Sequence, residues 1–266
     1  MYETTYHRPS SVDEAAALFS KGKESKYLAG GHTLIPVMKQ RLASPSDVID
    51  LGKIKDLIGI EVSADAVTIK AATTHYDVAG NGPVKKALPA LAHLASLIGD
   101  PAVRHRGTIG GSIANNDPAA DYPAAVLALG ATIKTNKRSI AADDFFKGLF
   151  TTALADGEII TQVVFPIAAK AGYSKMPHPA SRFALTGVFV VKTKAGDVRV
   201  TATGASQSGV MRVPAIEAAL KANWSAAALD SVKISADGLL TDIHGSSAYR
   251  ANLIKVMAQR AVAAAG

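Results

Sequence analysis

Two glycine-containing segments place the strongest constraint on how this chain of 266 residues can fold. The first, Tyr27 to Leu34, follows a strand-like run and contains Gly30 and Gly31, while the second, Arg104 to Asp117, has three glycines within five positions. Glycine lacks a Cβ atom, so successive free N–H groups can approach a ligand closely and form a nest for a phosphate. A plain turn also accounts for the first segment, and a glycine-rich hairpin with solvated polar residues for the second.

Composition narrows the possible functions. The chain has no cysteine, which excludes disulfides, thiolate nucleophiles and thiolate-held zinc or iron–sulfur clusters within it. Redox chemistry would therefore require a bound cofactor. The 29 Lys and Arg residues against 22 Asp and Glu give a net charge of +7, which suits nucleic acid, an acidic membrane face, an anionic ligand or an acidic protein. The basic residues are scattered and only 6% of the chain is aromatic, which argues against nucleic acid.

Several common signatures are missing from the sequence. There is no G-x-x-x-x-G-K-[ST] loop, no G-x-G-x-x-G after the first strand and no G-x-S-x-G elbow, and no two of the seven histidines have zinc-helix spacing. A hydrolase or an ordinary nicotinamide dehydrogenase is thus disfavoured, and no metal site is expected. Met1 to Thr5 lacks the features of a secretion signal, and the apolar run Phe183 to Val191 has about half the length of a membrane span. We expect a cytoplasmic protein without a transmembrane segment.

The pattern of hydrophobic and turn residues predicts an α+β protein. Ser11 and Glu14 form a capping box that opens a helix over Val12 to Ser20, and with the two short strands that follow it suggests a small α/β unit within the first 55 residues. Pro89 places the first turn of a helix over Lys85 to Ile98 near Leu88. The other expected strands are Lys26 to Ala29, Asp47 to Leu51, Ala66 to Ala71, Ala131 to Thr135, Glu158 to Phe165, Phe183 to Thr193 and Val198 to Gly204. The other expected helices are Pro123 to Leu129, Pro214 to Ala222 and Ser247 to Ala264, with a linker at Ala168 to Gly172 and a hairpin turn at Lys194 to Asp197.

Longer motifs carry a resemblance to a known family. AGGHTLIPVMKQRL at Ala29 to Leu42 and RGTIGGSIANNDPAADYPA at Arg106 to Ala124 resemble the two FAD-binding motifs of the flavin (medium) subunit of molybdenum hydroxylases. These are enzymes of the carbon monoxide dehydrogenase and xanthine dehydrogenase type. The resemblance extends from end to end, and includes TTH at Thr73 to His75, DPAVRHRGTIGG at Asp100 to Gly111 and YSKMPHPASRFALTGVFV at Tyr173 to Val190.

The resemblance implies a fold and a domain division. Residues 1–168 would form a PCMH-type FAD-binding domain of the vanillyl-alcohol-oxidase fold, made of two subdomains at about 1–55 and 56–168. Residues 169–266 would form a C-terminal α+β domain of the carbon monoxide dehydrogenase flavoprotein type, a small antiparallel sheet with helices.

The family also implies which residues contact FAD. Its two loops, a carboxylate, a lysine near the flavin and apolar contacts correspond here to Tyr27, Leu28, Ala29, Gly30, Gly31, His32, Thr33, Leu34, Ile98, Thr108, Ile109, Gly110, Gly111, Ser112, Asp121, Ile160 and Lys175. A fixed ammonium near the flavin would raise its reduction potential, although a lone lysine is more often solvated.

Three positions have no clear role at this stage. His32 and His75 would either line the cofactor or serve the structure, and Phe183 matches a position that can hold a tyrosine over the ring. If both loops are nests, valine at Gly110 or Gly111 should abolish FAD retention while most of the fold persists. No catalytic residue is expected in the chain.

The implied function is that of an electron-transfer subunit. A large molybdopterin-binding subunit would oxidise the substrate, a small subunit would carry [2Fe–2S] clusters, and FAD in this chain would pass the electrons to an external acceptor, in a heterotrimer or its dimer. The sequence leaves the substrate and the acceptor open. The alternatives are a stand-alone flavin oxidase or reductase of the same fold, and a nucleotide- or nucleic-acid-binding module.

Overall fold

The N-terminal part of the chain is a small parallel sheet covered by one helix. The computed structural model describes residues 1–265. Its first sheet has the order β1-β3-β2, and α1 (Val12–Lys21) packs on β2 and β3. The strands are β1 (Thr5–His7), β2 (Ser25–Leu28) and β3 (Asp47–Asp50). The predicted α/β unit is confirmed, and β1 is an additional strand whose three residues are too few to show a periodic pattern.

The predicted capping box is half formed. The hydroxyl of Ser11 accepts a hydrogen bond from the N–H of Glu14 at 3.2 Å, as expected. The carboxylate of Glu14 accepts from the N–H of Ser10 at 2.7 Å, one residue before the predicted partner. The start of α1 is therefore held from both sides of the N-cap.

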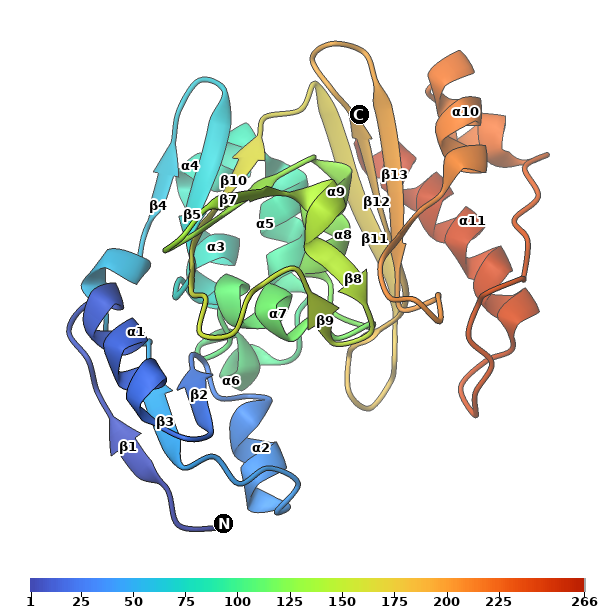
Figure 1. The fold of residues 1–266 in the computed structure, drawn as a ribbon. Helices are drawn as coiled ribbons and strands as arrows, with labels where there is room; N and C mark the ends of the chain where they lie inside the picture. The colour runs from blue at the N-terminus through green and yellow to red at the C-terminus, as the bar shows by residue number, and fades with distance from the viewer. Residues whose placement is uncertain (266) are drawn as a thin grey trace.

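The rest of the molecule is built in four layers, visible from left to right in Figure 1. The central sheet is antiparallel with the order β4-β5-β10-β6-β7, and helices α5 and α8 lie between it and a second antiparallel sheet, β11-β12-β13-β14. Helices α10 and α11 cover the outer face of the second sheet. The central strands are β4 (Ile60–Val62), β5 (Ala66–Lys70), β6 (Thr132–Thr135), β7 (Ser139–Ala141) and β10 (Ile160–Pro166).

The outer sheet and the helices complete the layers. The outer strands are β11 (Lys170–Pro177), β12 (Ala184–Lys192), β13 (Val198–Thr203) and β14 (Met211–Arg212). The layer helices are α5 (Pro89–Ser96), α8 (Tyr122–Ala128), α10 (Pro214–Ala222) and α11 (Ser247–Ala264). The smaller elements are α2 (Leu34–Lys39), α3 (His75–Gly80), α4 (Gly82–Ala87), α6 (Pro101–Arg104), α7 (Ile109–Asn115), α9 (Ala142–Phe145), β8 (Phe146–Gly148), β9 (Thr151–Thr152), and the 3-10 helices η1 (Lys55–Leu57) and η2 (Ala226–Leu229).

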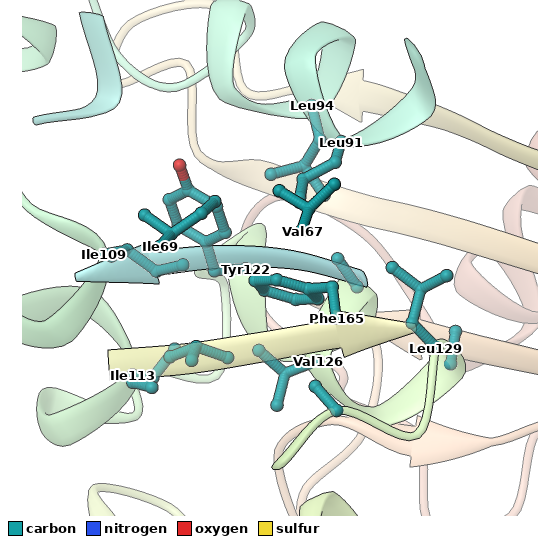
Figure 2. Packing of buried hydrophobic residues seen from close by; sticks show 14 of the residues in the cluster. Val67, Ile69, Leu91, Leu94, Ile109, Ile113, Tyr122, Val126, Leu129 and Phe165 are labelled. Atoms are coloured by element: carbon teal, nitrogen blue, oxygen red, sulfur yellow. The ribbon is translucent and has the colours of Figure 1, made fainter. Parts of the chain in front are cut away.

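The largest hydrophobic cluster lies between the two sheets. Figure 2 shows Val67 of β5 and Phe165 of β10 packing among side chains of α5 and α8, including Leu91 and Val126. Strand β12 is buried on both faces, which explains its unbroken apolar run. Its odd-numbered residues, such as Phe189, join this cluster, while the even-numbered ones pack under α10 and α11.

Most predicted elements lie within two residues of their expected ends, but two predictions are wrong. The helix expected over Lys85 to Ile98 is split into α4 and α5 at Leu88, whose φ and ψ are −147° and 68°. Pro89 has no N–H to donate and forces the preceding residue out of the helical region. Residues of the expected linker at Ala168 to Gly172 instead begin β11, where Gly172 pairs with Val190.

The glycine in that segment has a packing reason. A Cβ atom at Gly172 would overlap the carbonyl oxygen of Ala261 in α11. The glycine thus allows α11 to lie directly on β11. Within residues 1–265, no helix has the length and apolar character needed to cross a membrane.

Candidate functional site

A deep cleft separates the N-terminal unit from the layered body. Its volume is about 650 Å³, within the range of sites that enclose small molecules and cofactors. The strand β2 and the loop after it form one wall, and the segment around α7 with the end of β5 forms the other. Of the predicted cofactor residues, those that line the cleft are Tyr27, Leu28, Ala29, Gly30, Gly31, His32, Thr33, Leu34, Ile98, Thr108, Gly110, Gly111, Ser112, Asp121 and Ile160.

The first loop presents a run of unused backbone donors to the cleft. The N–H groups of Gly30 to Leu34 donate no hydrogen bond to any atom of residues 1–265. Gly31 has φ of +76°, a conformation that L-residues rarely adopt, and the chain then turns into α2. Successive N–H groups around such a residue form a concave site for an anion, and the positive end of the following helix adds to it. Between the plain turn and the nest, the geometry favours the nest.

The second segment is organised differently from either interpretation of its sequence. Thr108 caps helix α7, because its hydroxyl accepts from the N–H of Gly111 at 3.1 Å. The N–H of Ile109 donates to Thr73 at 3.2 Å and that of Gly110 to Ala71 at 2.8 Å. The prediction of a second backbone nest is therefore wrong, since these donors are already used, and the segment is not a hairpin.

Close packing explains the glycines of the second segment. A Cβ atom at Gly110 would lie 2.7 Å from the carbonyl oxygen of Ala71, and one at Gly107 would lie 2.6 Å from Nε2 of His75. Valine at Gly110 would thus disturb the fold itself, so the expectation that this substitution spares the fold is wrong. Ser112 lines the cleft.

Two of the predicted cofactor residues lie outside the lining. Ile109 is fully buried in the main hydrophobic cluster. Lys175 is also buried, with Nζ 2.9 Å from Oδ1 of Asp121 and 2.9 Å from the carbonyl oxygen of Arg182. Its ammonium group is therefore occupied by two partners, and its contact with the flavin stays a prediction.

Asp121 is a buried acid of the cleft wall. Tyr173 donates to its Oδ1 at 2.5 Å, and Lys175 pairs with the same carboxylate. Burial raises the pKa of Asp121, while the ammonium of Lys175 and the hydroxyl of Tyr173 act in the opposite direction. The pKa of Asp121 therefore depends on its burial and on two side chains of β11.

The histidines of the cleft differ in environment. His75 is 4% exposed, and burial lowers its pKa to about 3, with smaller contributions from His32 and Arg104. Its Nδ1 has no hydrogen-bond partner among residues 1–265. His75 is therefore a neutral group of the wall, whereas His32 is exposed in the first loop. Phe183 lies at the cleft with 48% of its surface exposed.

Sequence reasoning missed several lining residues. Ala71 and Ala72 line the cleft, and Ala71 lies directly against Gly110 of α7. Glu158 lines the cleft and is held by Arg138 through hydrogen bonds of 3.0 Å. Arg182 has a left-handed backbone with φ of +62°, which no sequence pattern marks.

Comparisons with known proteins agree with this geometry. The family described as "FAD binding domain in molybdopterin dehydrogenase" matches residues 2–168. The chain is 36% identical to the nicotine 6-hydroxylase medium subunit of Paenarthrobacter nicotinovorans, covering 98% of this chain and 96% of that one. It is 35% identical to the carbon monoxide dehydrogenase medium chain of Afipia carboxidovorans, over 97% and 94% of the two chains. The structure of reconstituted carbon monoxide dehydrogenase from Oligotropha carboxidovorans matches with a TM-score of 0.89 and 32% identity, over 99% and 97% of the chains.

The chain thus belongs to the family of FAD-binding domains of molybdopterin dehydrogenases. Within that family it is an FAD-binding medium subunit of a heteromeric molybdenum hydroxylase, an oxidoreductase subunit. The predicted family, fold class, cofactor and partners are confirmed, and the subunit role is supported over a stand-alone flavin enzyme.

Proposed function

We propose that the cleft holds FAD with its diphosphate on the N–H groups of Gly30 to Leu34. The observation that carries this assignment is the run of unused donors beside a cleft of about 650 Å³. A diphosphate needs several donors at once, and a backbone nest supplies them without a charged side chain. The residues present therefore fit FAD.

The remaining lining residues have separate roles in this proposal. The hydroxyls of Thr33 and Ser112 offer polar contacts beside the nest, and Asp121 offers a hydrogen-bond acceptor. Apolar side chains such as Leu57 and Ile160 exclude water from the wall. When bound, FAD supplies the electron-transfer chemistry, and the chain positions it and shapes its electrostatics.

We further propose a place for the chain in its enzyme. A large molybdopterin-binding subunit oxidises the substrate, a small subunit delivers electrons through [2Fe–2S] clusters, and this chain passes them to an external acceptor. The related chains are named for nicotine, carbon monoxide and glyceraldehyde at 36%, 35% and 35% identity, so similarity of this chain does not select a substrate.

We also propose that the enzyme lies in the cytoplasm, which cell fractionation tests. We propose a domain boundary at residue 168, which limited proteolysis tests.

Isolation of the complex tests the subunit role. The tagged full chain, purified from its native source, should bring down a large and a small subunit, and acid should release FAD from the complex. A flavin-free complex that also fails to take up added FAD would refute the function. A chain that is active by itself would favour a stand-alone flavin enzyme.

A pair of variants tests the diphosphate site. Gly31→Asp and Gly31→Asn have nearly the same shape, and both residues tolerate a positive φ better than others do. Only Asp brings a negative charge into the nest, so FAD affinity should be at least about tenfold lower for Asp than for Asn, equivalent to about 1.4 kcal/mol. Added salt should narrow the gap. Equal affinity of the two variants would show that the diphosphate lies elsewhere.

A further inference from the structure

Two histidines join the β11–β12 connection, residues 178–183, to the loop that precedes α11. Nε2 of His178 lies 3.2 Å from Nδ1 of His244, and the two rings meet edge to face with their centroids 4.4 Å apart. Of the connection, the residues that line the cleft are Ser181, Arg182 and Phe183. The pair therefore ties part of the cleft lining to a segment more than 50 residues later in the chain.

The hydrogen bonds of the pair determine which ring nitrogen carries a proton. Nδ1 of His178 accepts from the N–H groups of Ala180 and Ser181 at 3.2 and 3.3 Å. In the neutral ring the proton is therefore on Nε2, which donates to Nδ1 of His244. A metal ion on Nε2 would need the proton on Nδ1, where it would face two N–H donors. The pair thus fits a hydrogen bond between neutral rings better than a metal site.

An added proton breaks at least one of these contacts. On His178 the proton goes to Nδ1, which then no longer accepts from the backbone. On His244 it also goes to Nδ1, which then faces the N–H of His178 as a second donor. Imidazole is the side chain whose charge ordinarily changes between about pH 5 and 8. All the hydrogen bonds of the pair therefore form only while both rings are neutral.

Both segments are anchored, so the pair acts between fixed parts of the molecule. In the loop, the carboxylate of Asp242 accepts from the N–H of His244 at 2.9 Å and pairs with Arg250 of α11 at 2.7 Å. In the connection, prolines flank His178 on both sides, and each fixes its own φ. The position of the His178 ring is thus coupled to that of the connection backbone.

The connection also contains a residue whose backbone conformation needs support. Arg182 has φ of +62°, which costs free energy for a residue with a Cβ atom. Its N–H donates to the carbonyl oxygen of His178 at 2.9 Å, and its own carbonyl oxygen accepts from Lys175. When His178 moves, one of the contacts that hold this conformation is lost. Release of the histidine pair therefore favours opening of the connection.

We propose that His178 and His244 form a proton-sensitive latch, which holds the β11–β12 connection at the cleft while both rings are neutral and releases it in acid. Neither histidine lines the cleft, so the latch acts through the connection. The consequence for the cofactor rests on the proposed function: the acid form releases the bound flavin nucleotide faster.

Two carboxylates near the pair keep their charge while histidine titrates. Burial raises the pKa of Asp242, but hydrogen bonds from the backbone and from Arg250 outweigh burial and hold that pKa below its usual value. The N–H of Val103 and, more weakly, the charge of Arg182 lower the pKa of Asp100 at the start of α6. Neither acid therefore accounts for a change between about pH 5 and 8.

One other acid is coupled to the connection. Asp121 pairs with Lys175, which donates to the carbonyl oxygen of Arg182, and burial raises the pKa of Asp121. Variants of the histidine pair are needed to separate its titration from that of the latch. The other charged or titratable groups on the connection, the loop and the adjoining ends of β11 and α11 are Lys175, Arg182, Tyr249 and Arg250, residue types that ordinarily titrate above about pH 9.

Hydrogen–deuterium exchange of the complex measures the latch directly. Relative to the intrinsic rate, amides of residues 178–183 should exchange about three- to tenfold faster at about pH 5 than at about pH 8, the effect of losing one hydrogen bond. His244→Ala should bring exchange at about pH 8 to the wild-type level at about pH 5. His244→Asn keeps an acceptor oxygen near the position of Nδ1 and should restore slow exchange at about pH 8. The matched control is His93→Ala, which removes an exposed imidazole from α5 and should keep the wild-type profile.

Release of FAD from the complex provides the second measurement. At about pH 8, His244→Ala should release FAD about three- to tenfold faster than His93→Ala does. Equal exchange or equal release in these two variants would overturn the inference. A wild-type complex that neither contains nor takes up FAD would instead refute the proposed function, and the exchange profile would still test the latch. Thermal unfolding of each variant checks that the fold persists.

Discussion

Gly30 is the point at which the two sides of the cleft touch, so alanine at this position tests how closely they must pack. A Cβ atom there would overlap the carbonyl oxygen of Arg106 and lie 2.7 Å from Cα of Gly107. Both neighbours are backbone atoms, so no side-chain rotation relieves the contact. We expect Gly30→Ala to push the first loop away from the segment before α7.

The size of the effect follows from the cost of overpacking. Backbone displacement by an added methyl group costs about 1–3 kcal/mol. At about 2–4 °C per kcal/mol for a chain of this size, the melting temperature should fall by about 2–12 °C. The displaced loop carries the N–H groups assigned to the diphosphate, so FAD content of the complex should fall as well.

Gly80→Ala provides the control for this substitution. Gly80 ends helix α3, and a Cβ atom there would meet nothing within 4 Å. Alanine favours a helix over glycine by about 0.5–1 kcal/mol, so the control should melt at the wild-type temperature or slightly above it. Thermal unfolding of the full chain and flavin fluorescence of the complex provide the two measurements. Equal melting temperatures and equal FAD content in the two variants would refute the packing argument.

Three further predictions concern buried polar groups. Arg138 holds the pKa of Glu158 down at about 2, so Glu158→Gln should cost about 1.5–3 kcal/mol at neutral pH. Because the folded-state pKa is the lower one, this loss should shrink in denaturant titrations as the pH falls from the unfolded value, 4.5, toward 2. The pKa of His75 falls from 6.5 to about 3 on folding, so below 6.5 the unfolded chain binds the extra proton and stability decreases. NMR should show an imidazole of His75 that stays neutral at pH 5; a protonated ring there would contradict this. Arg250 is 3% exposed and donates to two backbone carbonyls at 2.6 Å, while its partner Asp242 is exposed. Arg250→Met leaves those carbonyls without this donor and should cost about 1–3 kcal/mol, and a loss below about 0.5 kcal/mol in urea unfolding would contradict its role.

Local patterns were sufficient for most of the secondary structure. Helix α11 and the turn between β12 and β13 lie where apolar spacing and a Lys-Ala-Gly-Asp sequence predict them. These patterns depend only on neighbouring residues, so they can be recognised without knowing what the rest of the chain packs against. Helix α5 starts at Pro89, beside the predicted Leu88, and the error is that the residues before Leu88 belong to the separate helix α4.

The two glycine-containing segments differ in how their backbone N–H groups are used, and local sequence patterns do not predict this difference. In the first loop the donors of Gly30 to Leu34 stay free, as a glycine pair after a strand suggests. In the second, the same type of sequence forms a helix start whose donors are taken by Ala71 and Thr73, from a segment more than 30 residues earlier. Whether a glycine-rich segment is a nest or a packing surface depends on what lies against it.

The sequence by itself indicated the family, the cofactor and most of the longer helices and strands, and 15 of the 17 predicted cofactor residues line the cleft. Only the tertiary structure showed that Lys175 and Tyr173 both bond to the buried carboxylate of Asp121. It also showed that Gly110 packs against Ala71 and that its N–H already donates to that residue. The physical reason is the same in each case: burial and hydrogen-bond partners are set by residues distant in the chain, and they determine which polar groups remain available to a ligand.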